Sequence, residues 1–111
     1  MEISEQREGN IIVLSPVGRV NNDTSRAFQT KLLSCVGSTA TKILIDFSGV
    51  EYISAAGLRA LMMASKQSKA TNGRLAIAGR TPMVKEIFTI SRFSLVVQVF
   101  DTIAKAITAM S

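Results

Sequence analysis

The chain has 111 residues, of which 47% are hydrophobic, 19% charged and 5% aromatic. This length supports one hydrophobic core and excludes a multidomain enzyme, while the composition indicates a globular fold rather than a disordered or fibrous chain. With no histidine and a single cysteine, Cys35, the sequence excludes zinc sites, cysteine–histidine nucleophile pairs and an internal disulfide. We expect Cys35 to lie in the core, and we expect no metal and no cofactor.

The net charge of +5 raises the question of a nucleic-acid partner. The 13 basic residues are spread along the whole chain and few aromatic rings are present to stack on bases, which indicates solvated basic faces and no nucleic-acid partner. No apolar run approaches the roughly 20 residues that span a bilayer. The start of the chain, 1–5, is acidic where a signal peptide is basic, so we expect a cytoplasmic protein without a membrane span.

Short β-like runs alternate with longer helical segments, and this alternation predicts an α/β fold. Residues 3–8 alternate weakly in polarity and residues 11–14 form an apolar run, with a Gly-Asn turn dipeptide between them. An N-terminal hairpin is therefore predicted, with its second strand closed by Ser15-Pro16 and Gly18. A helix is predicted over 24–36, with N-cap candidates at 21–24 and one apolar face. This face comprises Phe28, Leu32, Cys35 and Val36.

Residues 43–45 predict a strand buried on both faces, which delivers Asp46 to a loop. The longest helix is predicted from about Ala55 to the stop at Asn72-Gly73, with Leu58, Leu61 and Met62 on one face. After it come a predicted strand over 75–78 and a helix opened by Thr81 as cap and by Pro82. A last strand is predicted over 96–100. The C-terminal helix is predicted to be capped by Asp101, and its apolar face comprises Ile103, Ala106, Ile107 and Met110. The predicted order is ββαβαβαβα.

Few residues are available for catalysis, because the sequence has no histidine, one cysteine and no Gly-rich phosphate loop. Asp46 and Glu51 form an imaginable carboxylate pair, but an aspartate at a strand end is more often a turn or cap ligand. We expect no catalytic residue and no enzyme. A flavodoxin-like enzyme is disfavoured because it requires a cofactor loop that the sequence lacks.

The most informative stretch is 45–59. A buried strand brings Asp46 to a turn, and the small residues Ser54, Ala55, Ala56 and Gly57 then open a helix whose free N–H groups and positive dipole end would favour a phosphate. Alternatively, these small residues simply allow a tight turn into the helix, with Ser54 as N-cap.

This stretch resembles the signature of the STAS domain, in the branch of bacterial anti-sigma factor antagonists. The segments 46–50 (DFSGV) and 57–59 (GLR) match that signature, while 18–20 and 73–75 resemble the GR-containing stretches of the family. The resemblance extends over the whole chain, 1–111, and implies a single STAS domain with a mixed central sheet and about four helices.

In proteins of this family, the serine two positions before that glycine accepts phosphate from a serine kinase. The equivalent residue here is Ala55, which has no hydroxyl, and Ser54 is the nearest substitute. The sequence leaves open whether the alanine is native or replaces a serine. In either case the chain resembles the unphosphorylated, binding-competent form.

The resemblance implies partner switching. The unphosphorylated antagonist binds a serine-kinase anti-sigma factor of histidine-kinase-like ATPase fold and releases its target, phosphorylation ends the binding, and a PP2C-like phosphatase restores it. We expect a monomer. The expected partner-binding residues are Arg19, Asn21, Asn22, Asp46, Ser48, Ser54, Ala55, Ala56, Gly57, Leu58 and Arg59.

Two other functions remain open for a domain of this type. One is a ligand-sensing STAS module, because related domains occur on anion transporters and some bind ligands. The other is a scaffold or accessory subunit of a membrane transport complex, which would bind a partner that lacks kinase motifs.

Overall fold

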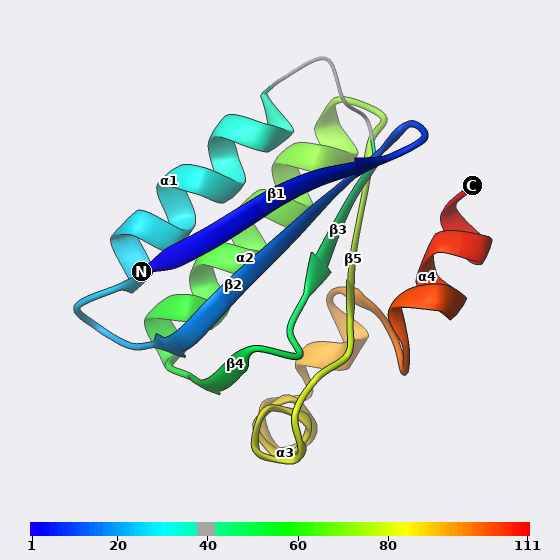
Figure 1. Cartoon of the computed structure of the whole chain (residues 1–111). Coiled ribbons are helices and arrows are strands. Elements are labelled where there is room, and N and C mark those ends of the chain that lie inside the picture. The colour runs from blue at the N-terminus through cyan, green and yellow to red at the C-terminus, as the bar shows by residue number, and fades with distance from the viewer. Residues whose placement is uncertain (38–41) are drawn as a thin grey trace.

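The chain folds into one mixed β-sheet with helices on both of its faces (Figure 1). The computed structural model describes residues 1–37 and 42–111. The strands in this part of the chain are β1 (Glu2–Glu8), β2 (Ile11–Val20), β3 (Lys42–Asp46), β4 (Val50–Ile53), β5 (Arg74–Ala78) and β6 (Gln98–Phe100). The helices are α1 (Ser25–Val36), α2 (Ala55–Ala70), α3 (Pro82–Ser91) and α4 (Ile103–Met110), with a 3₁₀ helix, η1, at Phe93–Leu95. The α/β class and the mixed sheet with four helices are confirmed.

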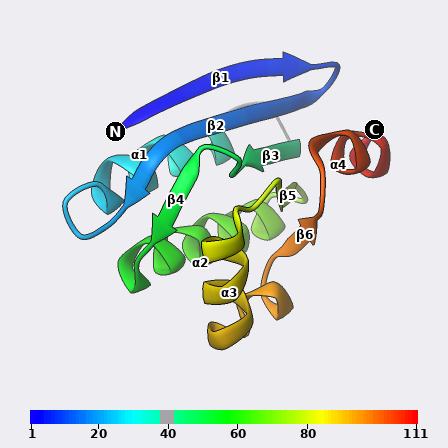
Figure 2. The same cartoon turned by 60° about the horizontal axis from the view of Figure 1, so that its bottom comes forward.

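The strands are ordered β1-β2-β3-β5-β6, and β4 pairs with β2. The hairpin β1–β2 is antiparallel and the other pairs are parallel. Ile11–Leu14 of β2 pair with β3, whereas Gly18–Val20 pair with β4. The strands β3 and β4 follow one another along the same edge of β2. The chain therefore runs along the sheet from β3 through β4 before it enters α2, as Figure 2 shows.

The sheet separates two hydrophobic cores. The larger core lies under α1, α2 and α3 and receives Ile43 and Ile45, whereas the smaller core lies under α4 and receives Leu44. Successive residues of a strand point to opposite faces, so a continuous apolar run fits a strand that is covered on both sides. The prediction of a strand buried on both faces is thus confirmed for β3. Among residues 1–37 and 42–111, none of the helices combines the length and the apolar character that a membrane span requires.

The predicted helices and their apolar faces agree with the structure. All four predicted face residues of α1 are buried, including Cys35 at 5% exposure. In α4, Ala106 and Met110 are buried, and Ile103 and Ile107 pack against the same core. These faces are predictable because the helical period alone determines which side chains share a side.

The second strand is longer than the sequence indicates, since β2 continues through Pro16 to Val20. Pro16 lacks an N–H group and normally interrupts a sheet. Here Ser15–Val17 pair with β1 on one edge and lie in the gap between the β3 and β4 pairings on the other. Pro16 is therefore compatible with the sheet, because it lies in the part of β2 that has no parallel neighbour.

Three further details correct the predictions. The last strand begins at Gln98 rather than at residue 96, because η1 and the turn after it occupy the preceding residues. Thr102 caps α4 instead of Asp101, since the Thr102 hydroxyl accepts a hydrogen bond from the Lys105 N–H at 3.1 Å. Thr81 stands at the N-cap position of α3, but its hydroxyl donates to the Val50 carbonyl at 3.0 Å and makes no cap bond.

Candidate functional site

The residues after β3 form a tight turn that Asp46 organises. One carboxylate oxygen of Asp46 accepts hydrogen bonds from the Ser48 N–H at 2.9 Å and from the Ser48 hydroxyl at 2.7 Å. Gly79 lies against this carboxylate with a φ of +74°, and a Cβ atom there would be 3.2 Å from the carboxylate oxygen. Asp46 is therefore a turn ligand, as its position at a strand end predicts.

Backbone hydrogen bonds tie the segment between β3 and α2 to its neighbours. The Gly18 N–H donates to the Gly49 carbonyl at 2.9 Å, and the Ser54 N–H donates to the Val20 carbonyl at 2.7 Å. The segment is thus fixed along β2 at both ends of β4. The predicted order has no strand between the turn at Asp46 and the helix that begins near Ala55, so β4 is an addition to it.

The first turn of α2 presents small side chains and free backbone donors. Ser54 is the N-cap, with its hydroxyl accepting a hydrogen bond from the Gly57 N–H at 3.2 Å, as predicted. Ala55 is exposed at the first helical position, and Ala56 is half-buried. The first N–H groups of a helix have no intrahelical acceptor and carry the positive end of the dipole. No acidic residue lies in this turn to balance that charge.

Gly57 holds this turn close to the sheet. A Cβ atom at Gly57 would lie 2.6 Å from Cγ1 of Ile53 and 2.7 Å from Cγ1 of Val20, both of which belong to the larger core. The residue is buried. Gly57 was expected to contact a partner, but its burial gives it a packing role instead, and we exclude it from the candidate contact surface.

The loop after β2 lies beside the start of α2 and is internally ordered. The Asn21 side-chain oxygen accepts hydrogen bonds from the N–H groups of Asp23 and Thr24 at 2.9 and 3.1 Å, while the Thr24 hydroxyl donates to the Arg19 carbonyl at 2.7 Å. The Arg19 guanidinium lies 4.7 Å from the centre of the Tyr52 ring. Sequence reasoning missed this cation–π contact, because Arg19 and Tyr52 face each other only through the pairing of β2 with β4.

The structure divides the predicted contact residues into two groups. One group surrounds the start of α2, which we call the α2 edge; it comprises Arg19, Asn21, Asn22, Ser54, Ala55, Ala56, Leu58 and Arg59. The other group is the turn of Asp46 and Ser48, which lies beside the end of β5. The four residues of β4, about 13 Å of extended chain, separate the two groups. The contact residues expected within 46–59 are therefore divided between the two ends of β4.

Exposure differs among the residues of the α2 edge. Arg19, Asn22, Ala55 and Arg59 are exposed, and the remaining members are half-buried. Ala55 and Arg59 are four residues apart on α2, so their side chains share one helical face. The edge combines two arginines with small side chains. In the described part of the chain, no three histidine, cysteine, aspartate or glutamate side chains lie close enough together to hold a metal ion.

Comparison with known proteins places this geometry in a family. The family model for the STAS domain matches residues 2–106. Bordetella bronchiseptica BtrV, described as an anti-sigma factor antagonist, is 27% identical over 93 residues, which are 84% of this chain and 80% of that protein.

Two solved structures share the fold. A crystal structure described as an anti-sigma factor antagonist from Thermotoga maritima superposes with a TM-score of 0.90 at 18% identity and covers 97% of this chain and 93% of its own. A sulfate transporter family protein from Wolinella succinogenes superposes with a TM-score of 0.79 at 17% identity, over 93% of this chain and 86% of its own. The sheet order, the short β4 and the glycine-tight start of α2 are thus features of a chain that belongs to the STAS domain family and is homologous to anti-sigma factor antagonists such as BtrV.

Proposed function

We propose that this protein is an anti-sigma factor antagonist that acts by partner switching. In its unphosphorylated form it binds a serine-kinase anti-sigma factor of histidine-kinase-like ATPase fold, and this binding releases the target of that factor. The observation that carries the proposal is an exposed residue, Ala55, at the first position of α2 in a chain of this family. In the family that the chain resembles, the serine that is phosphorylated occupies the equivalent position.

A phosphoserine at position 55 would act both on the start of α2 and on the partner. The phosphate would add about −1.5 to −2 charges at a helix N-terminus, where backbone N–H groups and the dipole stabilise an anion. The same charge would oppose an acidic or apolar partner surface through repulsion and desolvation. Alanine cannot carry this phosphate, so the chain remains in the binding-competent form, and a PP2C-like phosphatase has no substrate at this position.

Ser54 is poorly suited as a substitute phosphate acceptor. Its hydroxyl oxygen already accepts the Gly57 N–H, and the residue is half-buried. Phosphorylation there would alter the cap that begins α2. We therefore infer that the chain takes up no regulatory phosphate at 54 or 55, and that the α2 edge is the contact surface.

The proposal is tested by capture from the cytosol of the source cells. The chain, its Ala55→Ser variant and its Ala55→Glu variant serve as baits, and mass spectrometry identifies bound proteins and phosphorylated residues. Ala104→Glu is the matched control, because it adds the same charge at an exposed position of α4 on the opposite face of the sheet.

We expect the chain and Ala104→Glu to capture a kinase-fold ATPase. Ala55→Ser should acquire phosphate at position 55 and lose this partner, and Ala55→Glu should lose it without phosphate. Capture of no such ATPase by any bait would refute partner switching. Equal capture by the chain and Ala55→Glu would refute the α2 edge as the contact surface.

A second candidate is an accessory or ligand-sensing module of a membrane transport complex. The observation in its favour is the fold shared with the Wolinella succinogenes sulfate transporter family protein. This function would be supported if the baits capture a membrane protein without kinase motifs and Ala55→Ser remains unphosphorylated. In either role we expect a cytoplasmic monomer, which light scattering after gel filtration tests.

A further inference from the structure

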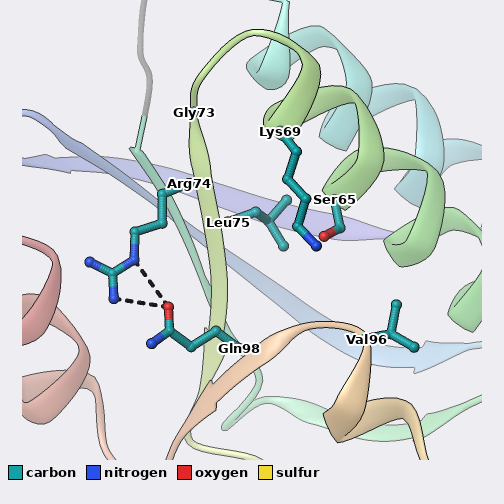
Figure 3. Close-up of a pocket in the computed structure, with 7 residues that line it drawn as sticks. All are labelled: Ser65, Lys69, Gly73, Arg74, Leu75, Val96 and Gln98. Carbon is teal, nitrogen blue, oxygen red and sulfur yellow. Dashed lines mark hydrogen bonds between the residues drawn. The ribbon is translucent and has the colours of Figure 1, made fainter.

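A pocket of about 190 Å³ lies at the end of α2 that is remote from Ala55. It is formed where the last two turns of α2 and the start of β5 face the segment that leads into β6 (Figure 3). The residues that line it are Ser65, Lys69, Gly73, Arg74, Leu75, Val96 and Gln98. None of them belongs to the α2 edge, and partner switching gives this pocket no role.

The α2 wall of the pocket carries an unused hydroxyl. Ser65 is 5% exposed, and within residues 1–37 and 42–111 its hydroxyl makes no hydrogen bond. Among the described residues, Arg80 Nε is the buried side-chain polar atom that lacks a partner, so the Ser65 oxygen, although its residue is largely buried, keeps contact with solvent on the pocket side. Figure 3 shows the Ser65 side chain on the side of α2 that faces β5. This hydroxyl is available as a donor to a bound molecule.

Lys69 adds a positive charge to the same wall. It follows Ser65 by four residues, so the two side chains share one helical face. In the described part of the chain, the salt bridge present is Glu5–Lys31, and no carboxylate oxygen lies within 4 Å of the Lys69 ammonium group. An ammonium and a hydroxyl that converge on a pocket match an anionic group that accepts hydrogen bonds.

The opposite wall is apolar and firmly held. Leu75 of β5 and Val96 line it, and Val96 is 39% exposed although it is a large aliphatic residue. Arg74 donates from Nε and Nη2 to Oε1 of Gln98 at 3.0 and 2.9 Å, and from Nη1 to the Ala109 carbonyl at 3.0 Å. Arg74 therefore fixes Gln98 at the rim and adds positive potential, with three of its five N–H donors engaged in these bonds.

We propose that this pocket binds a small organic anion that has one carboxylate head and a short aliphatic tail. The carboxylate accepts hydrogen bonds from the Lys69 ammonium and the Ser65 hydroxyl, and the tail packs on Leu75 and Val96. The volume lies below the roughly 300 to 1,000 Å³ of pockets for drug-sized ligands, so the tail is limited to a few carbons. The site is independent of the α2 edge, so its failure would leave partner switching untouched.

Titration of the ¹⁵N-labelled chain with butyrate, followed by amide chemical shifts, tests the proposal. We expect saturable shifts concentrated at 65–75 and 96–98. Acetate should bind more weakly by about fourfold for each methylene removed from the apolar wall, and uncharged butyramide should bind more weakly by about tenfold. Shifts that do not saturate, or equal binding of butyrate and butyramide, would overturn the proposal.

Three variants test which side chains bind the carboxylate. Lys69→Met keeps the length of the side chain and removes its charge, and it should weaken butyrate binding by about tenfold. Ser65→Ala should weaken it by about fivefold. Lys66→Met is the matched control, since Lys66 is exposed on the same helix and does not line the pocket. Equal losses in Lys66→Met and Lys69→Met would indicate general charge attraction and would also overturn the site.

Discussion

At the scale of single residues, Ser54 and Gly57 together determine how α2 begins. Ser54 ends the extended chain with a backbone N–H bound to β2 and a hydroxyl bound to the first turn of the helix. Gly57 then allows this turn to touch Val20 and Ile53. The exposed position of Ala55 depends on both residues, because it lies between them.

Replacement of Ser54 by alanine should lower the free energy of unfolding by about 1 kcal/mol, since the Gly57 N–H loses its acceptor. Ser54→Asp keeps a cap acceptor and adds a charge that the helix dipole favours, so its stability should match or exceed that of the parent. Urea denaturation measures both variants. Equal stability of Ser54→Ala and the parent would contradict the capping role.

Gly57→Ala should destabilise the protein, although alanine is the better helix former. The helix preference of alanine is worth about 1 kcal/mol, but forcing a methyl group into a packed core typically costs about 1 to 3 kcal/mol. The added Cβ would lie within 2.7 Å of two aliphatic side chains. Thermal denaturation should show a lower melting temperature, and a rise would mean that Val20 and Ile53 move aside at little cost.

At the scale of elements, α2 runs from the α2 edge at its first turn to the pocket at its last two turns. Its first turn lacks an acidic side chain, and its last turn contains Lys69. The positive end of its dipole is therefore not compensated by a side chain at the α2 edge, whereas a cation lies near the negative end. A charge introduced at position 55 consequently acts on both stability and binding.

Ala55→Glu should raise the free energy of unfolding by about 0.3 to 1 kcal/mol through the dipole, with a few tenths more from pairing with Arg59 one turn later. Ala70→Glu adds the same side chain at the last residue of α2, so it should destabilise. Urea denaturation measures the stability change of each variant. The two changes should have opposite signs, and both should shrink at high salt because salt screens the charges. A destabilised Ala55→Glu would contradict the electrostatic account and would invalidate that variant as a binding probe.

Local patterns in the sequence were sufficient for most elements, and the exceptions share a cause. The faces of α1 and α4 and the strand β3 follow from the periodicity of apolar residues. In contrast, β4 has only four residues, and the last residues of β2 follow a proline, so both depend on mutual pairing across about 30 residues of chain. Such pairing leaves no local signal. The contact of Arg19 with Tyr52 and the pocket at the end of α2 were missed for the same reason.

At the scale of the whole molecule, the outer strand β1 is tied to α1 through Glu5. Its carboxylate accepts a hydrogen bond from the Lys31 ammonium at 2.8 Å and lies 3.8 Å from the Cys35 sulfur. The hydrogen bond to Lys31 and its positive charge lower the pKa of Glu5, and the same hydrogen bond and the negative charge of Glu5 raise the pKa of Lys31. Burial raises the pKa of the Cys35 thiol. Cys35 therefore remains a protonated core residue at neutral pH.

This ion pair gives the stability of the protein a pH dependence of known sign. Because the pKa of Glu5 is lowered by folding, its contribution is present above the ordinary value of 4.5 and is lost as the pH falls through the folded-state pKa. The contribution of Lys31 is present below 10.5 and is lost as the pH rises through its folded-state pKa. Both side chains are more than a third exposed, so the effect is small.

Glu5→Gln should therefore flatten the acid limb of a plot of unfolding free energy against pH. Glu8→Gln is the matched control, because Glu8 is exposed on the same strand and makes no salt bridge in the described part of the chain. Denaturation at a series of pH values from neutral to acidic measures both. An identical acid limb in the parent and in Glu5→Gln would contradict the assignment of this dependence to the β1–α1 pair.

The candidate site could be predicted in part because a continuous stretch of sequence carries it. Ser54 as cap, Asp46 as turn ligand and the exposure of Arg59 follow from local chemistry. The separation of Asp46 and Ser48 from Ala55 does not, since it depends on the direction that β4 takes along β2. Residues that are close in sequence thus form two groups at opposite ends of β4.

We expect the strands of the sheet to pair at different stages of folding, because the parallel pairs are non-local. The hairpin β1–β2 closes through two residues and forms from local contacts, whereas β3 joins β2 only after the intervening chain has looped back with α1. The strand β3 also pairs with β5, so the centre of the sheet depends on two such returns. Chains with many non-local contacts cross a higher entropic barrier. We therefore expect a transition state in which β2, β3 and α1 are already assembled, and in which α4 docks afterwards.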